Sequence, residues 1–180
     1  MNDIASELAK LHYLTGAEFI VQLKSITTHQ GFHPLVTDPD IFIMGGEQDA
    51  DFENQLAAAR KAVELGYTVY ILPNPKGIRT ADFIFVRKGV YKMYDLKTIQ
   101  GKGSAGTQLM DSIGQSNRVL LHIISNYNAR ILASDIKSYF EANPRALEVL
   151  VFKGKKMIPV RRRLTFSPLF NRLFRELYEK

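Results

Sequence analysis

The spacing of apolar residues divides the chain into segments of helical and extended character. Residues 3–27 carry apolar side chains at helical spacing, and Gly16 interrupts them, which predicts two helices. Residues 51–65 combine an apolar stripe, formed by Phe52, Leu56, Ala59 and Val63, with an alanine-rich interior. Gly66 follows, which predicts a helix that ends at a glycine. Residues 29–38 show neither period, and we expect a loop there.

Short β-rich runs alternate with further helical segments in the rest of the chain. Strands are predicted at 41–44, 67–73, 81–86, 90–98, 118–124, 147–152 and 156–160, and helices at 107–117, 129–142 and 166–178. This order predicts a mixed α/β (α+β) fold, with a central mixed sheet flanked by helices. We expect one domain, 1–180, with a helical N-terminal segment (1–30), a core (about 51–124) and a basic C-terminal segment (151–180).

Composition and charge narrow the classes of function. The chain has no cysteine, which excludes disulfides, thiolate metal sites and a cysteine nucleophile. It has no apolar run of membrane-spanning length and no signal-peptide pattern, so we expect no membrane span and a cytoplasmic location. The net charge is +6; residues 151–180 carry +7, from nine Lys and Arg against two Glu, and the other 150 residues about −1. Such a basic segment fits a polyphosphate ligand, or simply a solvated surface.

Two acids and a lysine stand out around the predicted hairpin of residues 81–98. Asp82 and Asp95 lie at corresponding ends of its two strands, and strand alternation turns Asp95 and Lys97 to one face. Carboxylates are the ligands that Mg²⁺ prefers, so Asp82 and Asp95 are candidate metal ligands, with the carbonyl of Leu96 as a third. Lys97 would contact the scissile phosphate or activate a water molecule. This combination predicts phosphodiester cleavage.

The pattern Asp82…Asp95-Leu96-Lys97 resembles the PD-(D/E)XK nuclease superfamily, with Ala81 in place of its proline. The resemblance implies a restriction-endonuclease-like core and an endonuclease that depends on Mg²⁺ or Mn²⁺. It also implies a third acid on the preceding helix, for which Glu53 is favoured over the loop residue Glu47. Gln115, at the following helix–strand junction, is implied as a further catalytic candidate.

The sequence pattern GYTVYILPNP…ADFIF…YDLKT most resembles nuclease domains at the C-termini of contact-dependent growth-inhibition and other polymorphic bacterial toxins. That resemblance implies RNA, such as tRNA, as the target, delivery to the target-cell cytosol and a cognate immunity protein as partner. The alternatives are a DNA-cleaving nuclease of a mobile element and a non-catalytic protein that binds nucleic acid or a partner. A metal-independent RNase, which would use His122 or Tyr94, is a further alternative.

Several basic residues are candidate contacts for the phosphates of a nucleic acid. They are Lys102, in the glycine-rich stretch 101–106, Arg118 at the start of a predicted strand, and Arg161, Arg162 and Arg163 after the last predicted strand. Strand alternation would send Arg162 to the side opposite its two neighbours. The sequence does not set the oligomeric state.

Overall fold

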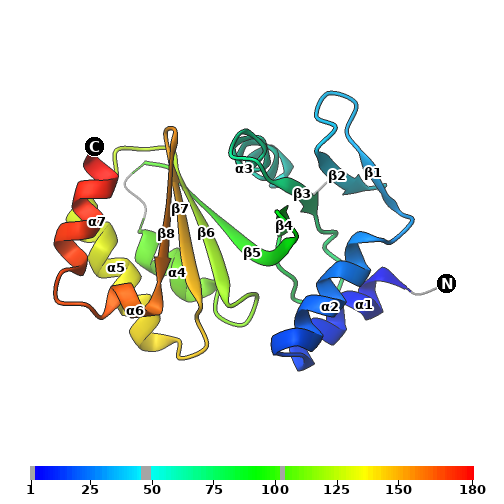
Figure 1. The fold of residues 1–180 in the computed structure, drawn as a ribbon, viewed down its shortest axis with the longest axis horizontal. Helices are drawn as coiled ribbons and strands as arrows, with labels where there is room; N and C mark the ends of the chain where they lie inside the picture. The colour runs from blue at the N-terminus through cyan, green and yellow to red at the C-terminus, as the bar shows by residue number, and fades with distance from the viewer. Residues whose placement is uncertain (1–2, 46–49, 102–103) are drawn as a thin grey trace. The chain divides into compact units, whose positions relative to one another are not determined.

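The computed structural model describes residues 3–45, 50–101 and 104–180 (Figure 1). The chain forms two compact units, Met1–Tyr94 (unit 1) and Asp95–Lys180 (unit 2). The boundary between them falls inside one strand, and each unit is described by itself.

The helices and strands follow the predicted alternation. Unit 1 contains α1 (Ile4–Lys10), the 3-10 helix η1 (Leu11–Tyr13), α2 (Gly16–Thr27), β1 (Phe32–Pro34), β2 (Ile41–Met44), α3 (Phe52–Glu64), β3 (Thr68–Ile71), β4 (Phe83–Arg87) and the first half of β5 (Val90–Ile99). Unit 2 contains the second half of β5, α4 (Ala105–Asp111), β6 (Arg118–Ile123), α5 (Ala129–Ala142), β7 (Glu148–Lys153), β8 (Lys156–Arg161), α6 (Arg162–Thr165) and α7 (Phe170–Glu179). The strands pair in chain order, β1 to β8, with parallel and antiparallel neighbours. The predicted mixed α/β class is confirmed.

The sheet of unit 1 is built from β1, β2, β3, β4 and the first half of β5. β2 and β3 are parallel, and the other neighbours are antiparallel. The β4–β5 hairpin turns through Lys88 and Gly89, whose φ angles are 51° and 76°. Two left-handed residues are what a tight two-residue hairpin turn requires, and they fix the register in which Phe83 lies opposite Tyr94.

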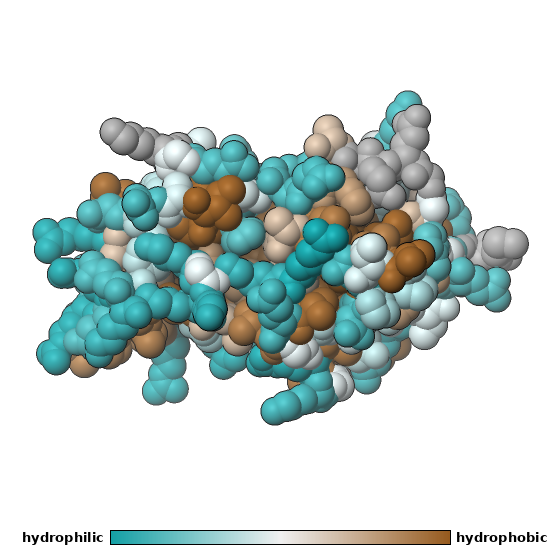
Figure 2. Space-filling model, turned by 90° about the horizontal axis from the view of Figure 1, so that it is seen from above, coloured by the Kyte–Doolittle hydropathy of each residue, from teal (hydrophilic) through white to brown (hydrophobic). Residues whose placement is uncertain are grey.

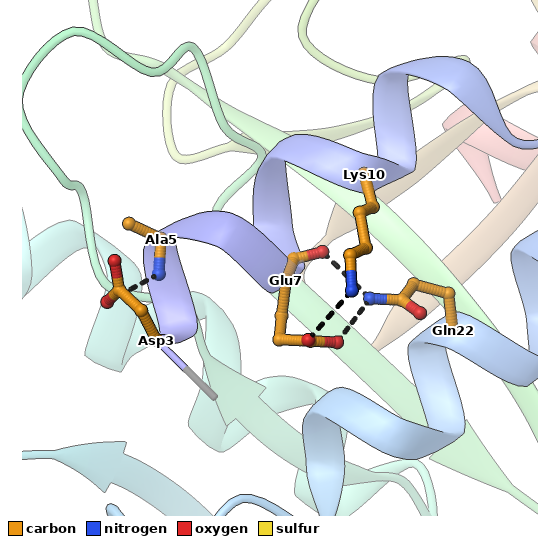
Figure 3. Close-up of polar contacts among 5 residues, drawn as sticks. All are labelled: Asp3, Ala5, Glu7, Lys10 and Gln22. Atoms are coloured by element: carbon orange, nitrogen blue, oxygen red, sulfur yellow. Dashed lines mark hydrogen bonds and ion pairs between the residues drawn. The ribbon is translucent and has the colours of Figure 1, made fainter. Parts of the chain in front are cut away.

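The helices α1, η1 and α2 pack against one face of this sheet. Leu8, Leu11, Leu23 and Ile26 from the helices form a buried cluster with strand residues that include Ile84 and Met93. Glu7 joins α1 to α2, because its carboxylate accepts hydrogen bonds from Gln22 Nε2 at 2.7 Å and Lys10 Nζ at 3.1 Å (Figure 3). Gln22 also donates to the carbonyl oxygen of Glu7 at 2.9 Å. α3 packs on β3 and β2.

The sheet of unit 2 consists of the second half of β5 with β6, β7 and β8. β5, β6 and β7 are parallel neighbours, whereas β8 returns antiparallel to β7. Its core lies on one face of the sheet, where Val119, Leu121, Val149 and Val151 pack with residues of α4, α5 and α7. α5 carries the chain between the parallel strands β6 and β7, as parallel neighbours require.

Three predicted elements differ from those observed. A strand, β1, lies within residues 29–38, where we expected a loop; at three residues it is too short to show an alternating pattern. α4 ends at Asp111, because Gly114 has a φ of 93° and the intervening residues form turns. The last predicted helix begins only at Phe170, after Pro168, and the separate short helix α6 precedes it.

The surface is mostly polar where Figure 2 shows it. Apolar side chains on that face gather in separate small groups among hydrophilic ones. Across the part of the chain that the structure describes, no helix combines the length and the apolar content needed to cross a bilayer.

Candidate functional site

Asp82 lies in unit 1, immediately before β4, where backbone and side-chain contacts hold it. Its N–H donates to the carbonyl oxygen of Tyr94 at 3.0 Å, and its own carbonyl oxygen accepts from the N–H of Leu72 at 2.8 Å. Its carboxylate Oδ1 accepts a hydrogen bond from Gln55 Nε2 at 2.9 Å. Main chain and side chain of Asp82 are therefore both positioned, the side chain by a residue of α3.

Gln55 is a site residue that the sequence analysis missed. The predicted stripe of α3 was Phe52, Leu56, Ala59 and Val63, but the buried positions are Gln55, Ala58, Ala59 and Ala62. Ala59 belongs to both sets, whereas Phe52, Leu56 and Val63 are half-buried, so the most buried face is rotated from the expected one. A glutamine in register with three alanines at helical spacing is the signal that could have identified it.

Glu53, the predicted third acid, is exposed in the first turn of α3. It lies two residues before Gln55, and side chains two apart on a helix point in different directions. The helix residue that contacts Asp82 is Gln55, and the metal-binding role of Glu53 stays a prediction.

Asp95 and Lys97 lie in unit 2, on the same face of β5, as predicted. Lys97 Nζ is 3.5 Å from Asp95 Oδ2, and only 4% of the Asp95 side chain and 19% of the Lys97 side chain are exposed. They are aligned with Val119 and Leu121 of β6, which belong to the face that carries the core of unit 2. Leu96, between them, is buried and turns to the opposite face; its carbonyl as a metal ligand stays a prediction.

Unit 2 also contains three buried polar residues, one in α5 and two just after the ends of α4 and α5. Tyr139, Ser112 and Asn143 are all buried, and Asn143 Nδ2 lies 3.4 Å from the Tyr139 hydroxyl. Burial raises the pKa of Tyr139, and the negative charge of Asp95 acts in the same direction. The tyrosine hydroxyl therefore stays protonated and can act as a neutral hydrogen-bonding group near the carboxylate.

The two predicted residues at the helix–strand junction, Gln115 and Arg118, make different contacts. Gln115 is half-buried in the turn after α4, and its N–H donates to the carbonyl oxygen of Ser112 at 3.0 Å. Arg118 Nη1 lies 3.1 Å from Oε1 of Glu148, whose side chain is 2% exposed. Glu148, which the sequence analysis also missed, is aligned with Arg118 on one side and Arg161 on the other. By alternation these charged residues lie on the sheet face opposite to Asp95.

The arginine triplet separates into one structural residue and two exposed ones. The guanidinium of Arg162 donates to the carbonyl oxygens of Phe140 at 3.0 Å, Ala146 at 3.4 Å and Asn143, at the C-terminal end of α5. Arg161 and Arg163 are exposed, so Arg162 differs from its neighbours as predicted, but strand alternation is not the reason, because β8 ends at Arg161 and Arg162 begins α6. Of the three, Arg161 and Arg163 are thus the better candidates for contacts to phosphate.

Two predicted positions, Lys102 and the alternative third acid Glu47, lie outside the described residues. Within residues 3–45, 50–101 and 104–180, no group of three or more His, Asp or Glu side chains could hold a metal ion.

Comparison with known proteins gives a structural match but no sequence match. No protein-family model and no curated protein matches the chain. A solved structure, the CdiA-CT/CdiI toxin and immunity complex from Burkholderia pseudomallei, matches with a TM-score of 0.41 and 13% identity, covering 66% of this chain and 98% of that chain. The functional proposal is accordingly built on the residues themselves.

Proposed function

We propose that the protein is a metal-dependent endonuclease of the PD-(D/E)XK type. The observation that carries this proposal is the Asp95–Lys97 pair, in which a buried carboxylate and a lysine meet at 3.5 Å on one strand face. A carboxylate is costly to bury without a cation, and Lys97 supplies one beside Asp95 on the same strand, so the fold keeps an acid and a lysine together in a mostly buried position. An acid and a lysine so placed match the second half of the nuclease motif.

The hairpin supplies the first half of the motif. The β4–β5 ladder ends with Phe83 opposite Tyr94, and Asp82 and Asp95 are the next residues of the two chain segments. The hydrogen bond from the Asp82 N–H to the Tyr94 carbonyl continues the pairing on the unit 1 side. We propose Asp82 and Asp95 as ligands of a divalent cation because they are the two acids of the motif, and carboxylates are the ligands that Mg²⁺ prefers.

Each residue then has a distinct role. Asp82 and Asp95 bind Mg²⁺ or Mn²⁺, with the Leu96 carbonyl and Glu53 as further candidate ligands. When bound, such an ion neutralises phosphate charge and lowers the pKa of water. Lys97 holds the scissile phosphate by charge and hydrogen bonding, or orients the attacking water. Gln115 is a candidate contact to the phosphate or to that water.

The proposed substrate is RNA, such as tRNA, by the resemblance to polymorphic toxin nucleases. Arg161 and Arg163, together with Lys102, are the candidate contacts to the phosphate backbone, and Arg118 and Arg162 are weaker candidates because of their partners within the fold. In this role the protein is a toxin domain that acts in the cytosol of a target cell, and an immunity protein is its proposed partner.

The test is cleavage of total RNA, purified tRNA and plasmid DNA by the purified protein. Each substrate is incubated with Mg²⁺, with Mn²⁺ and with EDTA, beside the Asp95→Ala variant. Lys137→Ala, which removes an exposed lysine of α5, serves as a matched control for surface charge. We expect cleavage that needs a metal, prefers RNA, is lost in Asp95→Ala and is retained in Lys137→Ala.

Other outcomes separate the alternatives. Cleavage that persists in EDTA would favour a metal-independent RNase, and cleavage of plasmid alone would favour a DNA nuclease. Binding to nucleic acid without any cleavage would favour a non-catalytic protein. A folded Asp95→Ala variant with full activity would contradict the assignment of the site.

A further inference from the structure

We infer that Gln55 is a positioning residue that orients the Asp82 carboxylate for a divalent cation. The inference rests on the proposed function, because it assumes that Asp82 is a metal ligand. It assigns a role to a residue outside the predicted motif, in a segment where the expected contributor was Glu53.

The hydrogen bond between Gln55 and Asp82 has a normal length and lies in a closely packed region. Gln55 Nε2 lies 2.9 Å from Asp82 Oδ1, and only 4% of Gln55 is exposed. A buried amide needs hydrogen-bond partners, and the carboxylate is one that Gln55 has. Ala58, Ala59 and Ala62, which share its face of α3, are fully buried, so the position of the helix is set by close packing. The donor is therefore held by a rigid element rather than by a loop.

The chemistry of the donor matters as much as its position. A lysine or arginine at this point would neutralise Asp82 and compete with a metal ion for it. A side-chain amide fixes the direction of the carboxylate but carries no net charge, so this contact leaves the attraction for a cation intact. Donors that orient a ligand in this way contribute to metal affinity without touching the metal.

The backbone of Asp82 completes the constraint. Hydrogen bonds to Tyr94 on one side and from Leu72 on the other hold its main chain at both strand neighbours. Rotation about the side-chain bonds is then the freedom that is left to the carboxylate, and the Gln55 amide restrains that rotation.

The experiment measures Mn²⁺ binding by isothermal titration calorimetry for the wild type, Gln55→Met, Asp82→Asn and the double variant. Asn54→Leu is the matched control, because Asn54 Nδ2 makes the same kind of contact, at 2.7 Å, to Asp51, which is not a proposed ligand. We expect Gln55→Met to weaken Mn²⁺ binding by about 10-fold, and Asn54→Leu to leave it unchanged. Excess Mn²⁺ should restore cleavage in Gln55→Met but not in Asp82→Asn.

The double variant distinguishes positioning from general structural support. If Gln55 acts through Asp82, adding Gln55→Met to Asp82→Asn causes no further loss of Mn²⁺ affinity. Wild-type affinity in a folded Gln55→Met variant, or additive losses in the double variant, would overturn the inference and leave the proposed function standing. A wild type that binds no Mn²⁺ would overturn both. Should Gln55→Met not fold, Gln55→Asn tests the same contact, since it keeps the amide but is one methylene shorter.

Discussion

Two acids from each unit illustrate two ways of holding a carboxylate. In unit 1 a glutamine amide donates to each, Gln22 Nε2 at 2.7 Å to Glu7 and Gln55 Nε2 at 2.9 Å to Asp82. In unit 2 a cation lies beside each, Lys97 at 3.5 Å from Asp95 and Arg118 at 3.1 Å from Glu148.

This comparison distinguishes two effects on a carboxylate, which are orientation of the group and neutralisation of its charge. An amide fixes a carboxylate and leaves its charge, whereas a cation cancels much of that charge and makes burial less costly. The more deeply buried acids, Asp95 and Glu148, have the cations. Removing a partner in unit 2 should therefore cost more than removing one in unit 1, and the following variants test that order.

The largest effect is expected for Lys97→Met. The variant keeps most of the side-chain volume but removes the charge beside Asp95, and we expect cleavage to fall by about 1,000-fold, the upper range for loss of one charge-stabilising donor. Single-turnover cleavage of RNA under saturating Mg²⁺ measures this. Lys97→Arg, which keeps a cation, should retain more activity than Lys97→Met; equal activity of the two would show that charge at this position is not what matters.

The second largest effect is expected for Arg118→Met. This variant removes the arginine of β6 that pairs with the buried carboxylate of Glu148. Breaking such a pair lowers the unfolding free energy by about 3 kcal/mol. Urea denaturation followed by circular dichroism measures it. The double variant Arg118→Met/Glu148→Gln should recover most of the loss, because no charge is then stranded; an additive loss would contradict the pairing.

An effect of intermediate size is expected for Arg162, a cation that donates to backbone carbonyl oxygens instead of a carboxylate. Arg162 donates at the C-terminal end of α5, where helix carbonyls lack partners, and its loss should cost about 2 kcal/mol. Arg163→Met is the matched control, since Arg163 is exposed and adjacent. We expect Arg162→Met to lower the unfolding free energy and Arg163→Met to leave it nearly unchanged while weakening RNA binding. The reverse pattern would invalidate the division of the triplet.

Most of the fold follows from periodicity. The helices α3 and α5, the β4–β5 hairpin and the strand β6 lie where the pattern predicts them, because long periodic runs and a two-residue turn leave few alternatives. β1 is a three-residue strand whose pairing with β2 defines it, and no local pattern can show that. α4 ends early because Gly114 takes a left-handed conformation within a sequence that otherwise continues the helical pattern.

The candidate site was predictable where strand alternation controls it. Alternation alone places Asp95 and Lys97 on one face, and the structure agrees. Gln55 and Glu148 were missed because their roles depend on which face of a helix is buried and which strand lies next to β6. Both depend on contacts distant in sequence. Glu53, which the family resemblance implies, is exposed on α3, and its role stays a prediction.

The smallest effect concerns Glu7, the unit 1 acid that has both a glutamine and a lysine partner. The hydrogen bond from Gln22 and then that from Lys10 lower the pKa of Glu7 below its ordinary value of 4.5. A lowered pKa means that the folded state binds the proton less readily than the unfolded state. The stabilisation is therefore present above the ordinary pKa and is lost as the pH falls through the lowered one.

Glu7→Gln removes this titration while it keeps the size of the side chain. At pH 7 we expect the variant to be less stable than the wild type by about 1.5 kcal/mol, the lower end of the contribution of a hydrogen bond to a charged group. Urea denaturation between pH 7 and pH 3 should show the two curves converging as the pH falls below 4.5, since the wild type loses the charge that the variant lacks. A constant difference across this range would mean that size or packing, rather than charge, joins α1 to α2. Gln22→Leu, which removes the amide but leaves Lys10, should keep part of the pH dependence and so show how much of it the amide supplies.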